Sequence, residues 1–95
     1  MSPADAVAPS SDEMAFVVET GTIMSNMVKN MGVKPSGNVD EDFVVLMQPH
    51  HQAAIEMAEA ELRYGQNERL RHIVEEITAQ QQHECAATNL SCPAC

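Results

Sequence analysis

The pattern of hydrophobic and polar residues along the chain predicts three helices and no strand. Apolar residues recur at alternating spacings of three and four, the spacing expected for one face of an α-helix. The first helix follows Ser10, which has the capping-box spacing to Glu13, and is predicted to run to about Met31. Gly32 then offers the left-handed conformation in which many helices stop.

The second and third helices are predicted to form an antiparallel hairpin. Asp40 is expected to cap the second helix, which ends at Gly65, and Asn67 is expected to cap the third. The third helix is expected to fade near Ala87. Because the turn between them is short, the two helices must lie side by side in opposite directions.

Both helices of this hairpin are apolar near the turn and polar or sulfur-rich away from it. The short turn also sets a register, in which His51 lies near Gln81 and Met47 lies near Glu84 or Cys85. The polar ends of the two apolar faces therefore meet, and this meeting point is the predicted functional site.

At this end the second helix carries two adjacent histidines after a proline. At about 100° per residue, His50 and His51 lie on either side of the direction of Met47, one turn further on. Pro49 removes one hydrogen bond of the helix and is expected to bend it beside them. The side chains of Met47 and the two histidines can then converge on one point.

Copper is the metal that this donor set favours, because thioethers select Cu(I) and imidazole binds either oxidation state. The first helix adds a one-sided stripe of three further methionines, Met24, Met27 and Met31. The alternative is that these methionines are ordinary core residues, as Met57 more readily is, and that the histidines are hydrogen-bonded within the protein.

Composition and charge narrow the classes of partner. The chain has 95 residues, a formal net charge of −9 and only five basic residues, so nucleic acids and anionic membranes are poor partners and a cation is a natural one. No stretch approaches the roughly 20 apolar residues that span a bilayer, so membrane insertion is not expected. The motifs of metalloproteases, phosphate-binding loops and serine hydrolases are absent, and no enzymatic activity is expected.

One helical domain, residues 12–90, is expected between two tails. Residues 1–11 are expected to form a disordered tail, similar to what remains on exported proteins after the signal peptide is removed. Residues 91–95 form a second tail with Cys92 and Cys95, in the sequence C-P-A-C. With Cys85, these residues leave open a redox pair, metal thiolates, or one disulfide with one free thiol.

The sequence D-E-D-F-V-V-L-M-Q-P-H-H-Q-A-A-I-E-M-A, followed by L-R-Y-G-Q-N and Q-Q-Q-H-E, resembles the domain-of-unknown-function 305 family of bacterial exported proteins. The likeness covers about residues 20–84 and ends where this chain reads C-A-A-T-N-L-S-C-P-A-C. That family is ferritin-like and includes a periplasmic copper-binding protein linked to copper tolerance. The resemblance therefore implies copper binding outside the cytoplasm, with these ligands: Met24, Met27, Met31, Met47, His50, His51 and Met57.

Together these features predict an all-α, ferritin-like helical bundle, made of a long antiparallel hairpin and a methionine-rich N-terminal helix. We expect a periplasmic or exported protein that binds copper in order to buffer it, deliver it or support copper tolerance. We also expect a twofold homodimer, since the hairpin has apolar residues on more than one face, including Val44, Ile55 and Leu62. Two alternatives stay open: a metal-free helical module that forms homo-oligomers, and a thiol redox carrier that uses Cys92 and Cys95.

Overall fold

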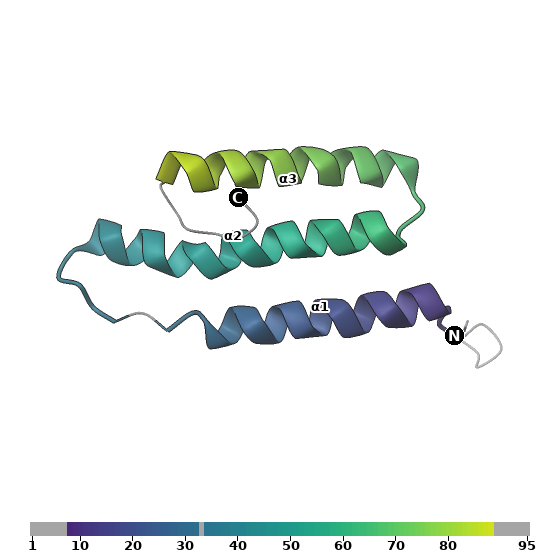
Figure 1. Ribbon diagram of the computed structural model, residues 1–95, viewed down its shortest axis with the longest axis horizontal. Coiled ribbons are helices and arrows are strands. Elements are labelled where there is room, and N and C mark those ends of the chain that lie inside the picture. The colour runs from purple at the N-terminus through teal and green to yellow at the C-terminus, as the bar shows by residue number, and fades with distance from the viewer. Residues whose placement is uncertain (1–7, 33, 89–95) are drawn as a thin grey trace, which may run out of the picture.

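The computed structural model describes residues 8–32 and 34–88 and folds them into three helices (Figure 1). Helix α1 spans Ser11–Lys29, α2 spans Val39–Tyr64 and α3 spans Glu68–Thr88. No strand occurs within these described residues. The all-α prediction is confirmed, and α3 ends within one residue of the predicted position.

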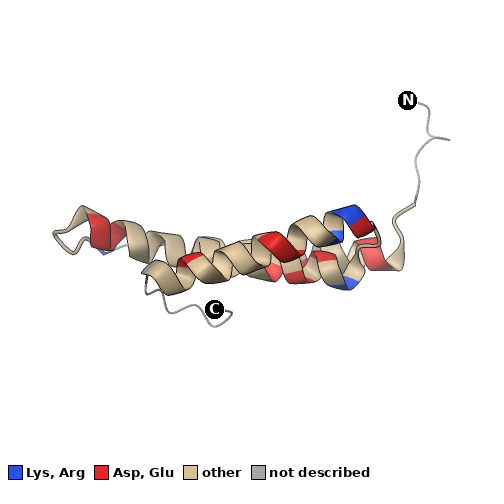
Figure 2. Cartoon of the chain, turned by 90° about the horizontal axis from the view of Figure 1, so that it is seen from above, with Lys and Arg blue, Asp and Glu red and all other residues tan. Residues whose placement is uncertain are grey.

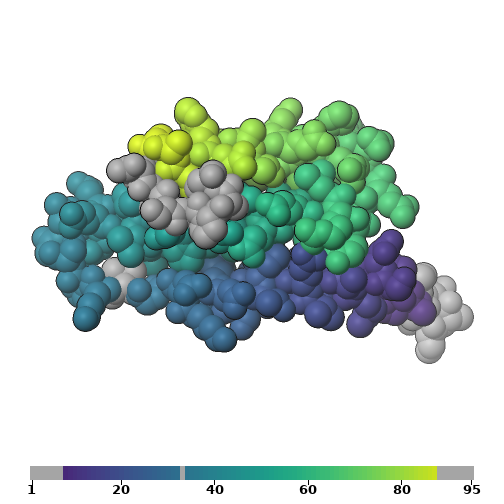
Figure 3. All heavy atoms as spheres, viewed as in Figure 1, coloured from purple at the N-terminus to yellow at the C-terminus, as the bar shows by residue number. Residues whose placement is uncertain are grey.

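Helix α2 is the central element of the fold. It contacts both α1 and α3, whereas α1 and α3 do not contact each other within the described part of the chain. Figure 3 shows the same arrangement with side chains, α1 and α3 lying on opposite sides of α2. The molecule is accordingly elongated, with extents of 57 × 26 × 22 Å. The predicted hairpin of the second and third helices is confirmed, and α1 packs against one side of it.

Helix α1 begins as predicted and ends differently. The hydroxyl of Ser10 accepts a 3.0 Å hydrogen bond from the N–H of Glu13, which caps the first turn. At the other end, the N–H of Asn30 donates to a carbonyl one turn earlier, at 3.1 Å, and closes the helix before Gly32 is reached. Among the described glycines a positive φ occurs at Gly37, not at Gly32. The predicted left-handed stop is therefore wrong.

Helix α2 begins two residues earlier than predicted. Asn38, not Asp40, is its N-cap, and its side-chain oxygen accepts from the N–H groups of Asp40 and Glu41, at 2.9 and 3.2 Å. Asparagine caps as well as aspartate does, and Ser36 holds it in place by accepting from its N–H at 3.2 Å. The carboxylates of the first turn lie near the positive end of the helix dipole, and this attraction stabilises the start of the helix.

The turn between α2 and α3 follows the prediction. The N–H of Gly65 donates to the carbonyl of Glu61 at 2.7 Å, and the side chain of Asn67 accepts from the N–H three residues on, at 2.9 Å. A Cβ atom at Gly65 would lie 2.7 Å from the Glu61 carbonyl, so a larger residue does not fit there. The guanidinium of Arg71 donates to the carbonyl of Leu62 at 2.7 Å and fastens α3 to the end of α2.

The buried core is small and contains no methionine among the described residues. It consists of Ile23, Ala53, Ile55, Ala58, Ala60, Val74 and Cys85. Ile55 is fully buried, and Val44 and Leu62 are half-buried, so the expectation that these residues face a partner is wrong for Ile55. The large apolar residues that are exposed lie instead on the outer helices and near the start of α2: Met14, Val17, Val18, Met24, Val28, Val39, Phe43, Val45, Leu70, Ile73 and Ile77.

Candidate metal-binding site

His51 lies where α2 meets α3, with 6% of its surface exposed. Its Nδ1 lies 2.9 Å from the carbonyl oxygen of Met47, one turn earlier on the same helix. Its Nε2 lies 3.0 Å from the Oε2 atom of Glu84 on α3. The predicted register is therefore confirmed in direction but shifted by about one turn, since His51 meets Glu84 and not Gln81.

The partner of Nδ1 defines where one hydrogen of His51 must lie. A carbonyl oxygen can only accept, so Nδ1 carries a hydrogen and donates it to Met47. At the other nitrogen, Nε2 lies within hydrogen-bond distance of the carboxylate of Glu84. A buried imidazole thus meets a carboxylate on another helix.

Pro49 lies within α2, which continues through it without a break. Its neighbourhood is hollowed by a pocket of about 300 Å³, which Asn30 at the end of α1 lines together with Pro49 and Gln52 of α2. The C-terminal end of α1 therefore lies beside the part of α2 that carries the histidines. His50 itself is half-buried.

The five predicted methionine ligands lie outside the buried core. Met24 is exposed, with 44% of its surface accessible, and the other four are half-buried: Met27, Met31, Met47 and Met57. Met27 and Met31 flank Asn30, which shares a pocket with Pro49, so they lie at the same end of the molecule as Met47. His51 nevertheless meets α3, whereas α1 lies on the opposite side of α2, so the methionines of α1 and the buried histidine face different sides of the central helix.

The described residues contain no group of three or more His, Cys, Asp and Glu side chains that could hold a metal ion together. Any site built on the predicted residues must therefore combine imidazole with thioethers. Glu84 is the functional candidate that sequence reasoning missed. It was placed on the inward face of the third helix, yet its pairing with His51 depends on a register that the turn alone did not fix.

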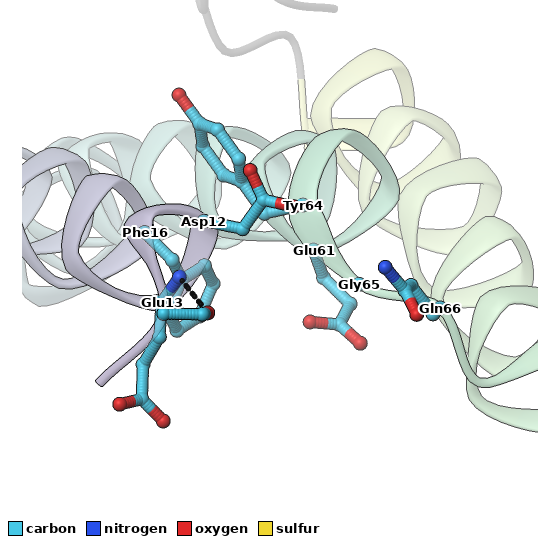
Figure 4. Close-up of a pocket in the computed structure, with 8 residues that line it drawn as sticks. Asp12, Glu13, Phe16, Glu61, Tyr64, Gly65 and Gln66 are labelled. Atoms are coloured by element: carbon cyan, nitrogen blue, oxygen red, sulfur yellow. Dashed lines mark hydrogen bonds between the residues drawn. The ribbon is translucent and has the colours of Figure 1, made fainter. Parts of the chain in front are cut away.

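A second pocket, of about 440 Å³, lies at the opposite end of the molecule and holds none of the predicted donors. It lies between the start of α1 and the end of α2, and Figure 4 shows Phe16 and Tyr64 there with three carboxylates. The dashed line in Figure 4 marks the bond that caps α1. Its lining residues are Ser10, Asp12, Glu13, Phe16, Glu61, Tyr64, Gly65 and Gln66.

Beside this pocket an exposed ion pair joins α1 to α2. The guanidinium of Arg63 donates to the carboxylate of Glu19 and also lies 5.7 Å from the centre of the Tyr64 ring. The hydrogen bond from Arg63 lowers the pKa of the Glu19 carboxyl, and the same bond raises the pKa of Arg63. Both groups are solvent-exposed, so the pair contributes little to stability.

Acidic residues dominate the charged surface. Figure 2 shows them along the helices, while blue basic segments gather mainly near the turn between α2 and α3. The formal net charge of −9 favours the approach of cations over that of anions. None of the helices, within the described ranges, is long and apolar enough to cross a membrane.

Cys85 is fully buried and disulfide-bonded. The predictions made for Cys92, Cys95 and the tail 91–95 lie outside the described residues, as does most of the predicted tail 1–11. The limits of the domain, 12–90, stay a prediction, although the three helices fall within one residue of them at the start and two at the end.

The family model described as "Domain of unknown function (DUF305)" matches residues 4–89. That range includes all three helices and each of the predicted donors. No curated protein and no solved structure matches the chain significantly.

Proposed function

The chain belongs to the DUF305 family, and we propose that it binds copper ions through thioether and imidazole side chains. Copper is the cargo of the protein, which buffers the ion, delivers it or supports copper tolerance and catalyses no reaction. The proposed ligands are those expected from the sequence: His50, His51, Met24, Met27, Met31, Met47 and Met57.

One observation carries this proposal: the methionines stay accessible in a chain that lacks core residues. Among the residues that the structure describes, the core has seven buried apolar residues, of which three are alanines. Methionine is flexible and fills irregular cores readily, yet none of the five methionines is buried. Part of each side chain therefore stays accessible, and the thioether is a donor that a soft ion such as Cu(I) prefers.

The two kinds of donor have different tasks in this proposal. The thioethers of Met24, Met27 and Met31 on or just after α1 are neutral and soft, so they hold Cu(I) without competing protons. The imidazoles of His50 and His51 on α2 bind either oxidation state. The acidic surface raises the local concentration of either cation.

A disulfide supports the proposed location outside the cytoplasm. Disulfide bonds persist in oxidising compartments such as the bacterial periplasm and are rare in the cytosol. The bonded state of the buried Cys85 therefore fits a periplasmic or exported protein. Thiol alkylation of the protein from a periplasmic extract, made with and without reductant, tests this: Cys85 labelled equally in both samples contradicts the location.

A second copy of the chain is the proposed partner. Three exposed apolar residues follow helical spacing on α3, Leu70, Ile73 and Ile77, and five lie on α1. Helical hairpins commonly bury such faces by pairing into larger bundles. Light scattering at high micromolar concentration should report a dimer, and a monomer at that concentration contradicts the proposal.

The same exposed apolar residues favour the alternative of a metal-free helical interaction module. The two functions are separated by competition titrations with Cu(I) and Cu(II) on the purified, alkylated chain. Copper binding predicts saturable binding of at least one ion per chain, with the affinity lowered when methionines are changed to leucine. Absence of saturable binding by either ion contradicts the proposal and leaves the interaction module. Reversible oxidation of Cys92 and Cys95 without copper binding supports the other alternative, a thiol redox carrier.

A further inference from the structure

We infer that Glu84 and His51 together form a Cu(II) site that bridges α2 and α3. This inference rests on the proposed copper-binding function and adds a ligand, the carboxylate of Glu84, that the motif in the second helix does not supply. The ion is bound by Nε2 of His51 and Oε2 of Glu84, which face each other.

The orientation of the His51 ring is the first argument. A histidine that binds a metal through one nitrogen usually donates its other ring N–H to a carbonyl or carboxylate, which fixes the ring. Nδ1 of His51 is already bonded in this way to the carbonyl of Met47, at 2.9 Å. Nε2 is thereby the nitrogen left for a metal, and it points at Glu84.

The spacing of the two donor atoms is the second argument. A metal about 2.0–2.2 Å from an imidazole nitrogen and a carboxylate oxygen, with an angle of about 90–110° between them, separates the two atoms by about 2.8–3.6 Å. Nε2 of His51 and Oε2 of Glu84 lie 3.0 Å apart. The lone pair of Nε2 points at Oε2, so both atoms can bind one ion after the partly exposed carboxylate of Glu84 turns aside. Mixed nitrogen and oxygen donors suit Cu(II).

The surroundings hold the pair in place and leave it reachable. Ile55 follows His51 by one turn of α2, Cys85 follows Glu84 on α3, and both are fully buried. They fix the two helices where the donors meet, which is the support that a metal site requires. The side chain of Glu84 is 44% exposed and that of His51 only 7%, so an ion enters from the side of Glu84.

Met47 is the nearest thioether to this pair along the helix. It precedes His51 by four residues and so lies on the same face of α2. It is half-buried and can supply a further ligand when copper is reduced. An ion held by His51 and Glu84 links the two helices and stabilises the hairpin, because it binds the folded state only.

The test compares Glu84→Gln with the matched control Glu76→Gln in the full chain. Glu76 is exposed on the same helix, so both variants lose one negative charge. Removing a residue that hydrogen-bonds to a metal ligand lowers metal affinity roughly 10–100-fold, and removing a ligand itself should lower the affinity at least as much. Glu84→Gln should therefore weaken Cu(II) binding at least about tenfold and abolish most of the rise in Tm caused by Cu(II). The control should bind as the wild type does.

The outcomes separate this inference from the proposed function. Equal Cu(II) affinity in the two variants, or Cu(I) binding by the wild type without Cu(II) binding, overturns the bridging site and leaves the proposed function. No binding of either ion overturns both. Glu84→Gln should leave Cu(I) affinity unchanged, because a carboxylate is a poor ligand for that ion.

A second measurement uses the wild type alone, so its result does not depend on whether Glu84→Gln folds. Cu(II) broadens the NMR signals of nuclei close to it. At a small fraction of one equivalent, the signals of His51 and Glu84 should broaden first. Broadening that starts elsewhere and spares both residues overturns the inference.

Discussion

The polar contacts in the two interfaces of α2 differ in how deeply they are buried. Towards α3, the imidazole of His51 is 7% exposed and bonded to Glu84. Towards α1, the ion pair of Arg63 and Glu19 is 48% and 31% exposed. A buried polar group must be satisfied and is therefore placed accurately, whereas an exposed pair adds little and constrains little. The first interface is the one that can hold donors in a fixed geometry.

In the proposed copper-binding function, this difference assigns Cu(II) and Cu(I) to different donors. The interface with α3 offers a nitrogen and an oxygen 3.0 Å apart, which suits Cu(II). The methionines of α1 are half-buried or exposed on a helix that contacts only α2 among the described elements. Flexible thioethers in such a setting can gather around Cu(I) without a prearranged site.

The largest effect is expected where α2 is most deeply buried. Ile55 shares the face of His51 and is 0% exposed, whereas Ile23 on α1 is 6% exposed. Ile55→Ala should lower the free energy of unfolding towards the upper end of about 2–5 kcal/mol, and Ile23→Ala towards the lower end, because α1 has one neighbour. Urea denaturation of both variants measures this. A larger loss for Ile23→Ala means that the α1 interface is the stronger one.

The next effect concerns the two histidines of the motif. His50→Ala combined with His51→Ala should weaken Cu(II) binding by more than about tenfold while helical content stays nearly the same. The control is His72→Ala combined with His83→Ala, since both of these residues are exposed on α3. Competition titration and circular dichroism give the readouts. Equal Cu(II) affinity in the two double variants removes the histidines from the site.

A smaller effect is expected for the methionine stripe that lies on α1 and just after it. Changing Met24, Met27 and Met31 to leucine should lower Cu(I) affinity by roughly tenfold and leave Cu(II) affinity unchanged, because leucine lacks the thioether. Each change conserves volume and should cost less than about 1.5 kcal/mol of stability. Met14→Leu on the same helix, 49% exposed and outside the proposed ligand set, is the control. A loss of stability without loss of Cu(I) binding identifies the stripe as packing.

The smallest effect concerns the ion pair of α1 and α2. Arg63 lowers the pKa of Glu19, so the pair contributes stability that is present above 4.5, the ordinary pKa of a glutamate, and is lost as the pH falls through the lowered value. Arg63→Gln should therefore destabilise slightly at pH 7 and not at pH 3. The control is Arg69→Gln. Arg69 is exposed on α3, and its replacement removes the same charge and leaves the pair of Arg63 and Glu19 intact. A pH-independent difference between the two variants contradicts the pairing.

The helices and the hairpin follow from local rules, which is why the sequence was sufficient to predict them. Apolar spacing marks each helix, and the short turn at Gly65 leaves only an antiparallel arrangement. The predicted start of α2 was wrong, because Asn38 and Asp40 are both good caps and lie two residues apart. The register was off by about one turn, since the angle between packed helices is set by side chains along the whole interface.

The positions of the proposed donors on their helices were predictable, but their surroundings were not. Spacing places Met47, His50 and His51 on neighbouring faces of one helix, whatever the rest of the fold does. The same spacing fits a methionine in a core and one at a surface, so the accessibility of the α1 stripe could not be read from the pattern. The pairing of His51 with Glu84 depends on two segments 33 residues apart.

Native mass spectrometry of the full chain tests copper binding most directly. Spectra are recorded with Cu(I) and with Cu(II), beside a variant that carries alanine at both histidines and leucine at the five methionines of the proposed site. The account predicts at least one copper ion per wild-type chain in each oxidation state and none on the folded variant. No copper on the wild type, or the same number of ions on the variant, contradicts it.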